Sequence, residues 1–280
     1  MRWGYALIWA GDYLTRDEDP LLAKLKFLAH YGLHTTGTTL EAIDKLPEAT
    51  RDQVGQLLVD HDLALTPVLH APYFDHDADK VARGIERQLE LLAKWREFLR
   101  VPLATTSAGP YHRFSREPSL ETQMERLATH LPTFASACHA MGIPFGIENH
   151  GDYYLGDLVG LCQQVPHLGI FLDTGNCYLI GEAPLPAYEA AVPYAVGTHF
   201  KDHHVRPCPD ARPLHFEVAP SVLGEGDVPL ETCYRLLRER NPNPDALVME
   251  IELIMPSDRP VIESFEQSLA FVRSLEAKYG

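Results

Sequence analysis

Four short apolar runs in the second half of the chain each end in a residue that can bind a metal ion. They end at Glu148, Asp173, His199 and Glu250, which are separated by 25, 26 and 51 residues. An ionised carboxylate that follows such a run is costly to bury unless it finds a partner or a metal. A gap of about 25 residues accommodates one strand, one helix and two loops, the repeat of a (β/α)8 barrel. Because the strand ends of a barrel meet at one face, the spacing allows all four residues to surround one ion.

The rest of the sequence favours the same fold, an α/β (β/α)8 TIM barrel forming a single domain over residues 1–280. Strand-like and helix-like stretches alternate without an obvious linker. We expect strands at Trp3–Trp9, His34–Thr39, Ala64–His70, Leu103–Ser107, Ile143–Glu148, Gly169–Asp173, Ala195–His199 and Ala246–Glu250. We expect helices at Leu21–His30, Leu40–Asp60, Asp77–Leu99, Ser119–Met141, Leu155–Gln164, Pro186–Ala191, Leu230–Arg238 and Ile262–Lys278.

A doubly wound parallel sheet also alternates in this way. The chain lacks a G-x-G-x-x-G after its first strand, however, and its candidate ligands spread over four strand ends, which favours the closed barrel. Two helix boundaries are clear in the sequence. Asp19 and Pro20 form an N-cap and first-turn pair, whereas Ser119 and Gly142 mark the start and end of a later helix.

Composition narrows the function classes. The formal charge of −15 disfavours a surface that neutralises phosphates, so we expect no nucleic acid partner. No apolar stretch reaches the roughly 18–20 residues of a membrane helix, and the first ten residues suit a strand better than a signal peptide. The five cysteines are odd in number and show no C-x-x-C pair, which predicts free thiols in the cytoplasm.

One long interruption, His203 to Asp227, separates the seventh expected strand from the next helix. It carries four prolines and a Gly-Glu-Gly sequence. Long loops on the catalytic side of a barrel often cover an active site, so we expect residues 203–227 to do so. The alternative is a surface excursion with a short strand of its own at His215–Val218.

Several segments carry a resemblance to a known family. They are Gly146–Gly151, Leu172–Asn176, Thr198–Asp202 and Leu223–Gly226. Together they resemble the xylose isomerase-like TIM-barrel superfamily and, more narrowly, its sugar (phosphate) isomerase/epimerase branch. The resemblance implies one divalent ion held by Glu148, Asp173, His199 and Glu250, with Glu148 and Glu250 also moving protons.

Three carboxylates and one imidazole form a hard, oxygen-rich ligand set. Such a set favours Mn²⁺, with Mg²⁺ or Co²⁺ as alternatives and Zn²⁺ less suitable. A hydroxy-ketone chelated by the ion would have an acidified C–H, so Glu148 and Glu250 could shuttle a proton through a cis-enediolate. Return of the proton to the neighbouring carbon or oxygen gives isomerisation, and return to the opposite face gives epimerisation. Loss of a β-hydroxyl would instead give dehydration, of the inosose or dehydroshikimate type.

Each candidate ligand has a structural alternative. Glu148 or Glu250 could pair with Lys201, Asp173 could only cap its turn, and His199 could be a hydrogen-bonded core residue. Glu252 is a second candidate on the last strand, because side chains two residues apart share a face. We prefer Glu250 since it ends the purely apolar run.

A second group of residues is expected to contact substrate. His70 ends the third strand, whereas Trp9 could form an apolar wall at the end of the first. Arg206, in the long loop, is a candidate for binding a substrate phosphate or carboxylate. The full set is His70, His150, Lys201, Asn176, Trp9 and Arg206.

The sequence differs at two places from branches of the superfamily that it resembles. The endonuclease IV-like branch resembles this chain but has a histidine where Asn176 stands, which argues against a three-zinc nuclease. Many sugar epimerases have a glutamate where the second strand here ends in threonines, Thr35–Thr39. We expect an isomerase or epimerase acting on a small carbohydrate, with a dehydratase or a non-catalytic sugar-binding barrel as alternatives. A homo-oligomer is possible, although the sequence gives no interface signal.

Overall fold

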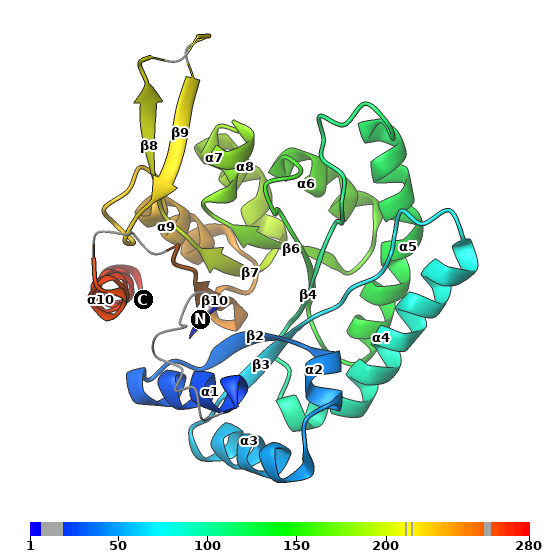
Figure 1. The fold of residues 1–280 in the computed structure, drawn as a ribbon. Helices are drawn as coiled ribbons and strands as arrows, with labels where there is room; N and C mark the ends of the chain where they lie inside the picture. The colour runs from blue at the N-terminus through cyan, green and yellow to red at the C-terminus, as the bar shows by residue number, and fades with distance from the viewer. Residues whose placement is uncertain (7–18, 211, 214, 255–258) are drawn as a thin grey trace.

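The computed structural model describes residues 1–6, 19–210, 212–213, 215–254 and 259–280. Eight parallel strands form a nearly closed barrel surrounded by helices, which confirms the predicted fold class (Figure 1). The barrel strands are β1 (Arg2–Tyr5), β2 (Thr35–Thr39), β3 (Ala64–Val68), β4 (Ala104–Ser107), β5 (Phe145–Glu148), β6 (Leu168–Asp173), β7 (Ala195–Phe200) and β10 (Val248–Ile251). Their order around the sheet is β1-β10-β7-β6-β5-β4-β3-β2. Between β1 and β2, the backbone N–H of His34 donates to the carbonyl of Trp3 at 2.7 Å.

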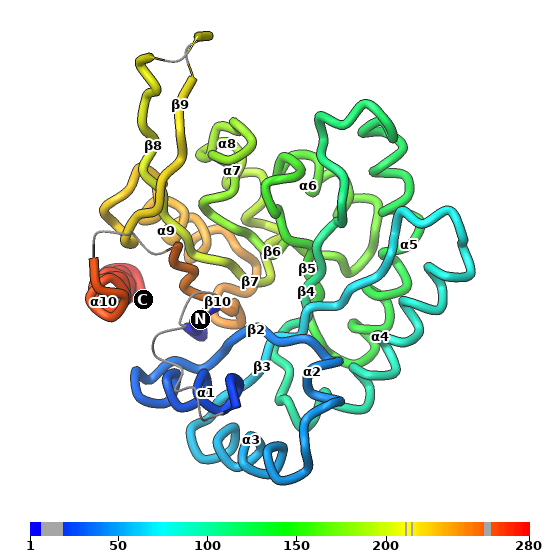
Figure 2. The backbone as a smooth tube through the Cα atoms, in the orientation of Figure 1, coloured from blue at the N-terminus to red at the C-terminus, as the bar shows by residue number. Residues whose placement is uncertain are grey.

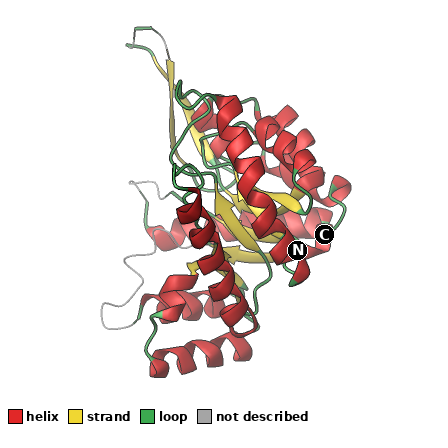
Figure 3. Cartoon of the chain, turned by 90° about the vertical axis from the view of Figure 1, so that its right-hand side faces the viewer, coloured by secondary structure: helices red, strands yellow, loops and turns green. Residues whose placement is uncertain are grey.

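The helices follow the strands in chain order around the barrel (Figure 2). They are α1 (Pro20–Tyr31), α2 (Leu40–Asp44), α3 (Glu48–Asp60), α4 (Ala78–Leu99), α5 (Leu120–Ala140), α6 (Leu155–Gln164), α7 (Asn176–Ile180), α8 (Pro184–Ala191), α9 (Leu230–Arg240) and α10 (Val261–Tyr279), with 3-10 turns at Val192–Tyr194 and Pro244–Ala246. None of these helices is both long and apolar enough to cross a lipid bilayer. The two chain termini lie side by side (Figures 2 and 3).

Two details differ from the expected elements. The single helix expected over Leu40–Asp60 is two helices, because α2 ends at Asp44 and Pro47 precedes the first turn of α3. Proline fits that position since it fixes φ and needs no donor there. The short helix α7 was not expected from the sequence. It begins at Asn176, directly after the turn that follows β6.

A small apolar layer fills the barrel below the strand ends. Leu103, Phe171 and Val248 are buried together, with Val196 packed against them. Gly197 leaves the space they need, because a Cβ there would lie 2.7 Å from Leu103 Cδ2. The ring of Phe171 in turn meets the His199 imidazole edge-on at 4.7 Å between centroids. The layer therefore supports the strand ends from below.

The long interruption between β7 and α9 forms an antiparallel hairpin of β8 (His203–Cys208) and β9 (His215–Pro220). It contains the short strand that the sequence suggested at His215–Val218. The hairpin stands out from the barrel on the side of α7 (Figures 1 and 3). Its role as an active-site cover stays a prediction.

Candidate metal centre

Four side chains that can bind a metal ion converge where β5, β6, β7 and β10 end. Glu148, Asp173, His199 and Glu252 each offer one ligand atom, and these atoms all lie within 4.8 Å of one another. Asp173 is fully buried and Glu252 is 7% exposed. The strand ends bring together residues that are up to 104 positions apart in the sequence.

The turn after β6 holds Asp173 in place. Asp173 Oδ1 accepts hydrogen bonds from the backbone N–H groups of Gly175 at 2.8 Å and Asn176 at 3.0 Å. The Asn149 side chain bonds both the N–H and the carbonyl of Asp173, which joins the ends of β5 and β6. Asp173 is thus a turn cap, as the structural alternative supposed. Its second oxygen, Oδ2, faces the other candidate ligands and lies 2.8 Å from the Lys201 ammonium.

His199 lies between several carboxylates. Its Nδ1 is 2.9 Å from Glu148 Oε1 and 3.2 Å from Glu252 Oε2, and its Nε2 is 3.6 Å from Glu250 Oε2. Burial alone would lower the pKa of His199, but the attraction and hydrogen bond of Glu148, with help from the other glutamates, raise it well above its usual value. Burial would likewise raise the pKa of Glu148, yet the His199 charge holds it below its usual range.

Lys201 is a buried cation in the same group. Its Nζ lies 2.8 Å from Asp173 Oδ2 and 2.9 Å from Glu252 Oε2, and it donates to Asn176 Oδ1 at 3.3 Å. Even so, burial raises the pKa of Asp173 to about 6, with Lys201 opposing the shift. Burial therefore outweighs the attraction of Lys201 in setting the pKa of Asp173.

These residues fit a divalent metal ion. Asp173 Oδ2 and Glu252 Oε2 are buried atoms that both face the group, and the Lys201 ammonium lies within 2.9 Å of each. Carboxylate oxygens are the hard donors that Mn²⁺ and Mg²⁺ prefer. With Lys201 charged and His199 neutral, the three carboxylates leave two negative charges, which a divalent ion would neutralise.

The structure brings Glu252, rather than the expected Glu250, into this group. Glu250 lies opposite His199 in the sheet register, but its Oε1 accepts a hydrogen bond from Thr66 Oγ1 at 3.1 Å. Strand β10 continues to Ile251, so Glu252 shares the face of Glu250 and lies nearer the open end of the barrel. The two-residue period was the sequence signal for Glu252, and the geometry of the strand end favours Glu252 over Glu250 as the candidate ligand.

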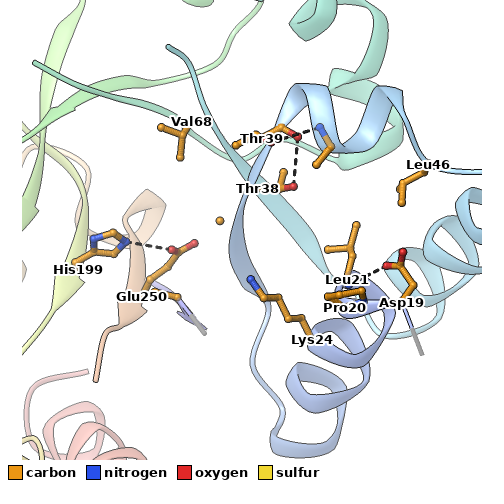
Figure 4. A pocket seen from close by; sticks show the side chains of 13 residues that line it. Asp19, Pro20, Leu21, Lys24, Thr38, Thr39, Leu46, Val68, His199 and Glu250 are labelled. Atoms are coloured by element: carbon orange, nitrogen blue, oxygen red, sulfur yellow. Dashed lines mark hydrogen bonds and ion pairs between the residues drawn. The ribbon is translucent and has the colours of Figure 1, made fainter. Parts of the chain in front are cut away.

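A cavity of about 610 Å³ opens beside His199 and Glu250 (Figure 4). Its other walls come from the start of α1, the end of β2, and α2. The residues that line it are Ala6, Asp19, Pro20, Leu21, Lys24, Gly37, Thr38, Thr39, Ala42, Leu46, Val68, His199 and Glu250. The sequence had singled out the threonines of β2 as a departure from epimerases, but it gave no signal for Lys24.

The sequence model of the xylose isomerase-like TIM barrel family matches residues 25–275. The chain belongs to this family. No curated protein sequence matches it. Among solved structures, this xylose isomerase-like barrel is similar to D-psicose 3-epimerase from Clostridium cellulolyticum H10, at 15% identity and a TM-score of 0.70 over 98% of this chain and 99% of that chain.

Two other solved structures share this fold. A probable 3-DHS dehydratase involved in petrobactin synthesis in Bacillus anthracis has 14% identity and a TM-score of 0.68 over 97% of this chain and 99% of that one. A xylose isomerase-like TIM barrel protein from Mycobacterium smegmatis, solved in complex with magnesium, has 16% identity and a TM-score of 0.66 over 94% and 91%. At these identities the likeness shows a shared fold.

The residues expected to bind substrate differ in their burial and in their distance from the candidate metal ligands in this xylose isomerase-like barrel. His150 lies close enough to help lower the pKa of Glu148, although it is exposed. His70 is exposed beyond the end of β3, and Arg206 is exposed on β8, away from the metal-binding group. Asn176 is buried and donates to the carbonyl of Asn149 at 2.9 Å, which indicates a structural role. Trp9 lies outside the described residues.

Proposed function

We propose that this xylose isomerase-like barrel is a divalent-metal-dependent isomerase or epimerase that acts on a small hydroxy-ketone or hydroxy-aldehyde sugar. The observation that carries the proposal is the convergence of Glu148, Asp173, His199 and Glu252 at the carboxyl ends of the strands. Barrel enzymes build their active sites at this face. An epimerase and a magnesium-bound barrel of the same fold support the proposal, as does a cavity of sugar size beside the group.

We assign one metal ion to Glu148, Asp173, His199 and Glu252. Manganese suits the donor set best, with magnesium or cobalt as alternatives. When bound, the ion would polarise a substrate carbonyl and acidify the neighbouring C–H. Lys201 stays charged in this arrangement, because the Asp173 and Glu252 carboxylates more than offset burial and raise its pKa above its ordinary value. Its role is to hold these two ligands in place.

Glu148 and Glu250 are the proposed proton-transfer pair. In the metal-free protein the His199 charge lowers the pKa of Glu148, and a bound divalent ion would act in the same direction, so this carboxylate would be ionised and able to accept a proton from carbon. Glu250 reaches the cavity from the other side of His199, and the Thr66 hydroxyl fixes its Oε1. One glutamate would remove the proton to give a cis-enediolate and the other would return it. Return to the neighbouring atom isomerises the sugar, whereas return to the opposite face of the same carbon epimerises it.

Deuterium exchange tests the proposal and separates it from dehydration. The manganese-loaded protein is incubated in D₂O with a panel of ketoses, and deuterium at the α-carbon is followed by NMR. We expect exchange without water loss. An unsaturated product would favour a dehydratase, the activity proposed for the Bacillus anthracis protein of the same fold.

Glu148→Gln and Glu250→Gln should abolish exchange while the protein still folds. Glu86→Gln on the exposed face of α4 is the matched control. Full activity in both active-site variants would refute the mechanism.

The cellular setting of the enzyme is also a proposal. All five cysteines carry free thiols, which suits the reducing cytoplasm expected from the sequence. The proposed partner is a small carbohydrate substrate.

A further inference from the structure

A second lysine of the site, Lys24, lies in the cavity apart from the candidate metal ligands. Lys24 extends from α1 into the cavity that reaches His199 and Glu250 (Figure 4). It is half-buried, and it has no ion pair or hydrogen bond with any residue that the structure describes. The other lysine of the site, Lys201, is by contrast held by two carboxylates.

The walls of the cavity around Lys24 are largely neutral. The end of β2 contributes Gly37, Thr38 and Thr39, where an acidic residue would have satisfied the lysine. Two carboxylates line the cavity among the residues that the structure describes, and one of them, Asp19, accepts a hydrogen bond from the N–H of Leu21 at 2.9 Å at the start of α1. The other, Glu250, belongs to the catalytic pair. Lys24 therefore lacks a dedicated counter-ion within the described residues.

Partial burial destabilises the charged form of an ammonium group that has no partner. Burial lowers the pKa of Lys24, and the attraction of Glu250 opposes the shift only in part. An incoming anion would recover this free energy, because charge-assisted hydrogen bonds are stronger than neutral ones.

We propose that Lys24 binds an anionic group, a carboxylate or a phosphate, at the end of the substrate that lies away from the metal centre. The substrates would then be sugar acids or sugar phosphates rather than neutral ketoses. This inference rests on the proposed function, because that function places the reacting end of the sugar at the metal. It also replaces Arg206 as the anion-binding residue, since Arg206 is exposed on the β8–β9 hairpin.

The test is isothermal calorimetry of the manganese-loaded protein at pH 7. The probes are D-fructose, which is neutral, D-fructose 6-phosphate and D-glucuronate. We expect the wild type to bind at least one anionic probe about tenfold more tightly than D-fructose. The stronger of the two anionic probes then distinguishes a phosphate from a carboxylate substrate.

Lys24→Met should bring the affinities for the anionic and neutral probes to about the same value, and Lys24→Arg should keep most of the preference. Lys26→Met, at an exposed position of the same helix, is the matched control and should keep it fully. Thermal unfolding checks that each variant is folded.

Equal affinity of the wild type for all three probes would overturn the proposal, as would an undiminished anion preference in Lys24→Met. Because binding is measured without turnover, these outcomes are separate from failure of the proposed function. An enzyme that exchanges the proton of D-fructose but shows no anion preference would keep its function and lose this inference. A protein that prefers anions but exchanges no proton would support the role of Lys24 and contradict the proposed function.

Discussion

The Lys201 ammonium group lies 2.9 Å from Glu252 Oε2, with both side chains buried where β7 and β10 end. The same ammonium group lies 2.8 Å from Asp173 Oδ2. Lys201 therefore holds together two of the four residues that could bind a metal. Because Lys201 neutralises part of the charge of Asp173 and Glu252, changing Glu252 should alter both the charge of the centre and its affinity for a metal.

The two glutamates of β10 should separate metal binding from catalysis. Glu252→Gln removes a charged ligand, so we expect manganese affinity to fall by more than about tenfold. Glu250→Gln leaves the four ligands intact and should keep affinity within a few-fold of the wild type while abolishing deuterium exchange. Metal titration and exchange assays on both variants check this. The opposite pattern would restore Glu250 as the ligand, as the sequence suggested.

Metal binding should release a proton from His199. Its pKa is raised well above the usual value by Glu148, so near pH 7 the metal-free protein carries an imidazolium. An ion that binds the imidazole must displace that proton, and affinity should therefore rise as the pH increases from 6 to 8. Calorimetry in two buffers of different ionisation enthalpy measures the protons released. An affinity independent of pH over this range would contradict the assignment of His199.

Removing the Lys201 charge should destabilise the metal-free protein. Lys201→Met leaves buried Asp173 without its paired cation and leaves Glu252 with only the His199 imidazolium, and breaking such a buried pair costs about 3–5 kcal/mol. We expect urea denaturation to show this loss, and added manganese to restore part of it. Lys80→Met, which removes a pair with Asp75 at an exposed site, is the control and should change stability little. Equal effects of the two substitutions would show that the buried pairs do not stabilise the centre.

Asp202 should be the main support of the loop before α9. Its carboxylate accepts hydrogen bonds from the N–H groups of Gly224, Gly226 and Val228. Asp202→Asn turns one acceptor into a donor, so we expect a loss of about 1–3 kcal/mol in unfolding free energy. Asp227→Asn is the comparison, because that more exposed carboxylate accepts one bond, from the N–H of Val205. A larger loss for Asp227 would show that Asp202 is not the main support.

Much of the fold was predictable from local patterns. Asp19 caps α1 through the N–H of Leu21, and Ser119 caps α5 through that of Thr122, as the sequence indicated. Gly142 follows α5 with a φ of +72°, a left-handed conformation that suits glycine. These features depend on neighbours within a few residues, so a sequence is sufficient to locate them.

The candidate site was predictable only in part. The spacing of the apolar runs predicted that Glu148, Asp173 and His199 meet at the strand ends, because each run ends at one of these residues. The choice between Glu250 and Glu252 depends on where β10 stops and on how far its neighbours reach, which one strand does not reveal. Lys24 was missed because it occupies an ordinary polar position of an amphipathic helix. Its significance comes from the cavity it faces.

The central claim is that the strand ends form a metal site, and elemental analysis of protein purified without chelator tests it most directly. We predict about one divalent ion per chain, mainly manganese, magnesium or cobalt, and its loss in Glu252→Gln. Three zinc ions per chain would instead indicate a nuclease-type cluster. A chain that carries no metal, and takes up none on titration with manganese, would contradict the account and favour a non-catalytic barrel.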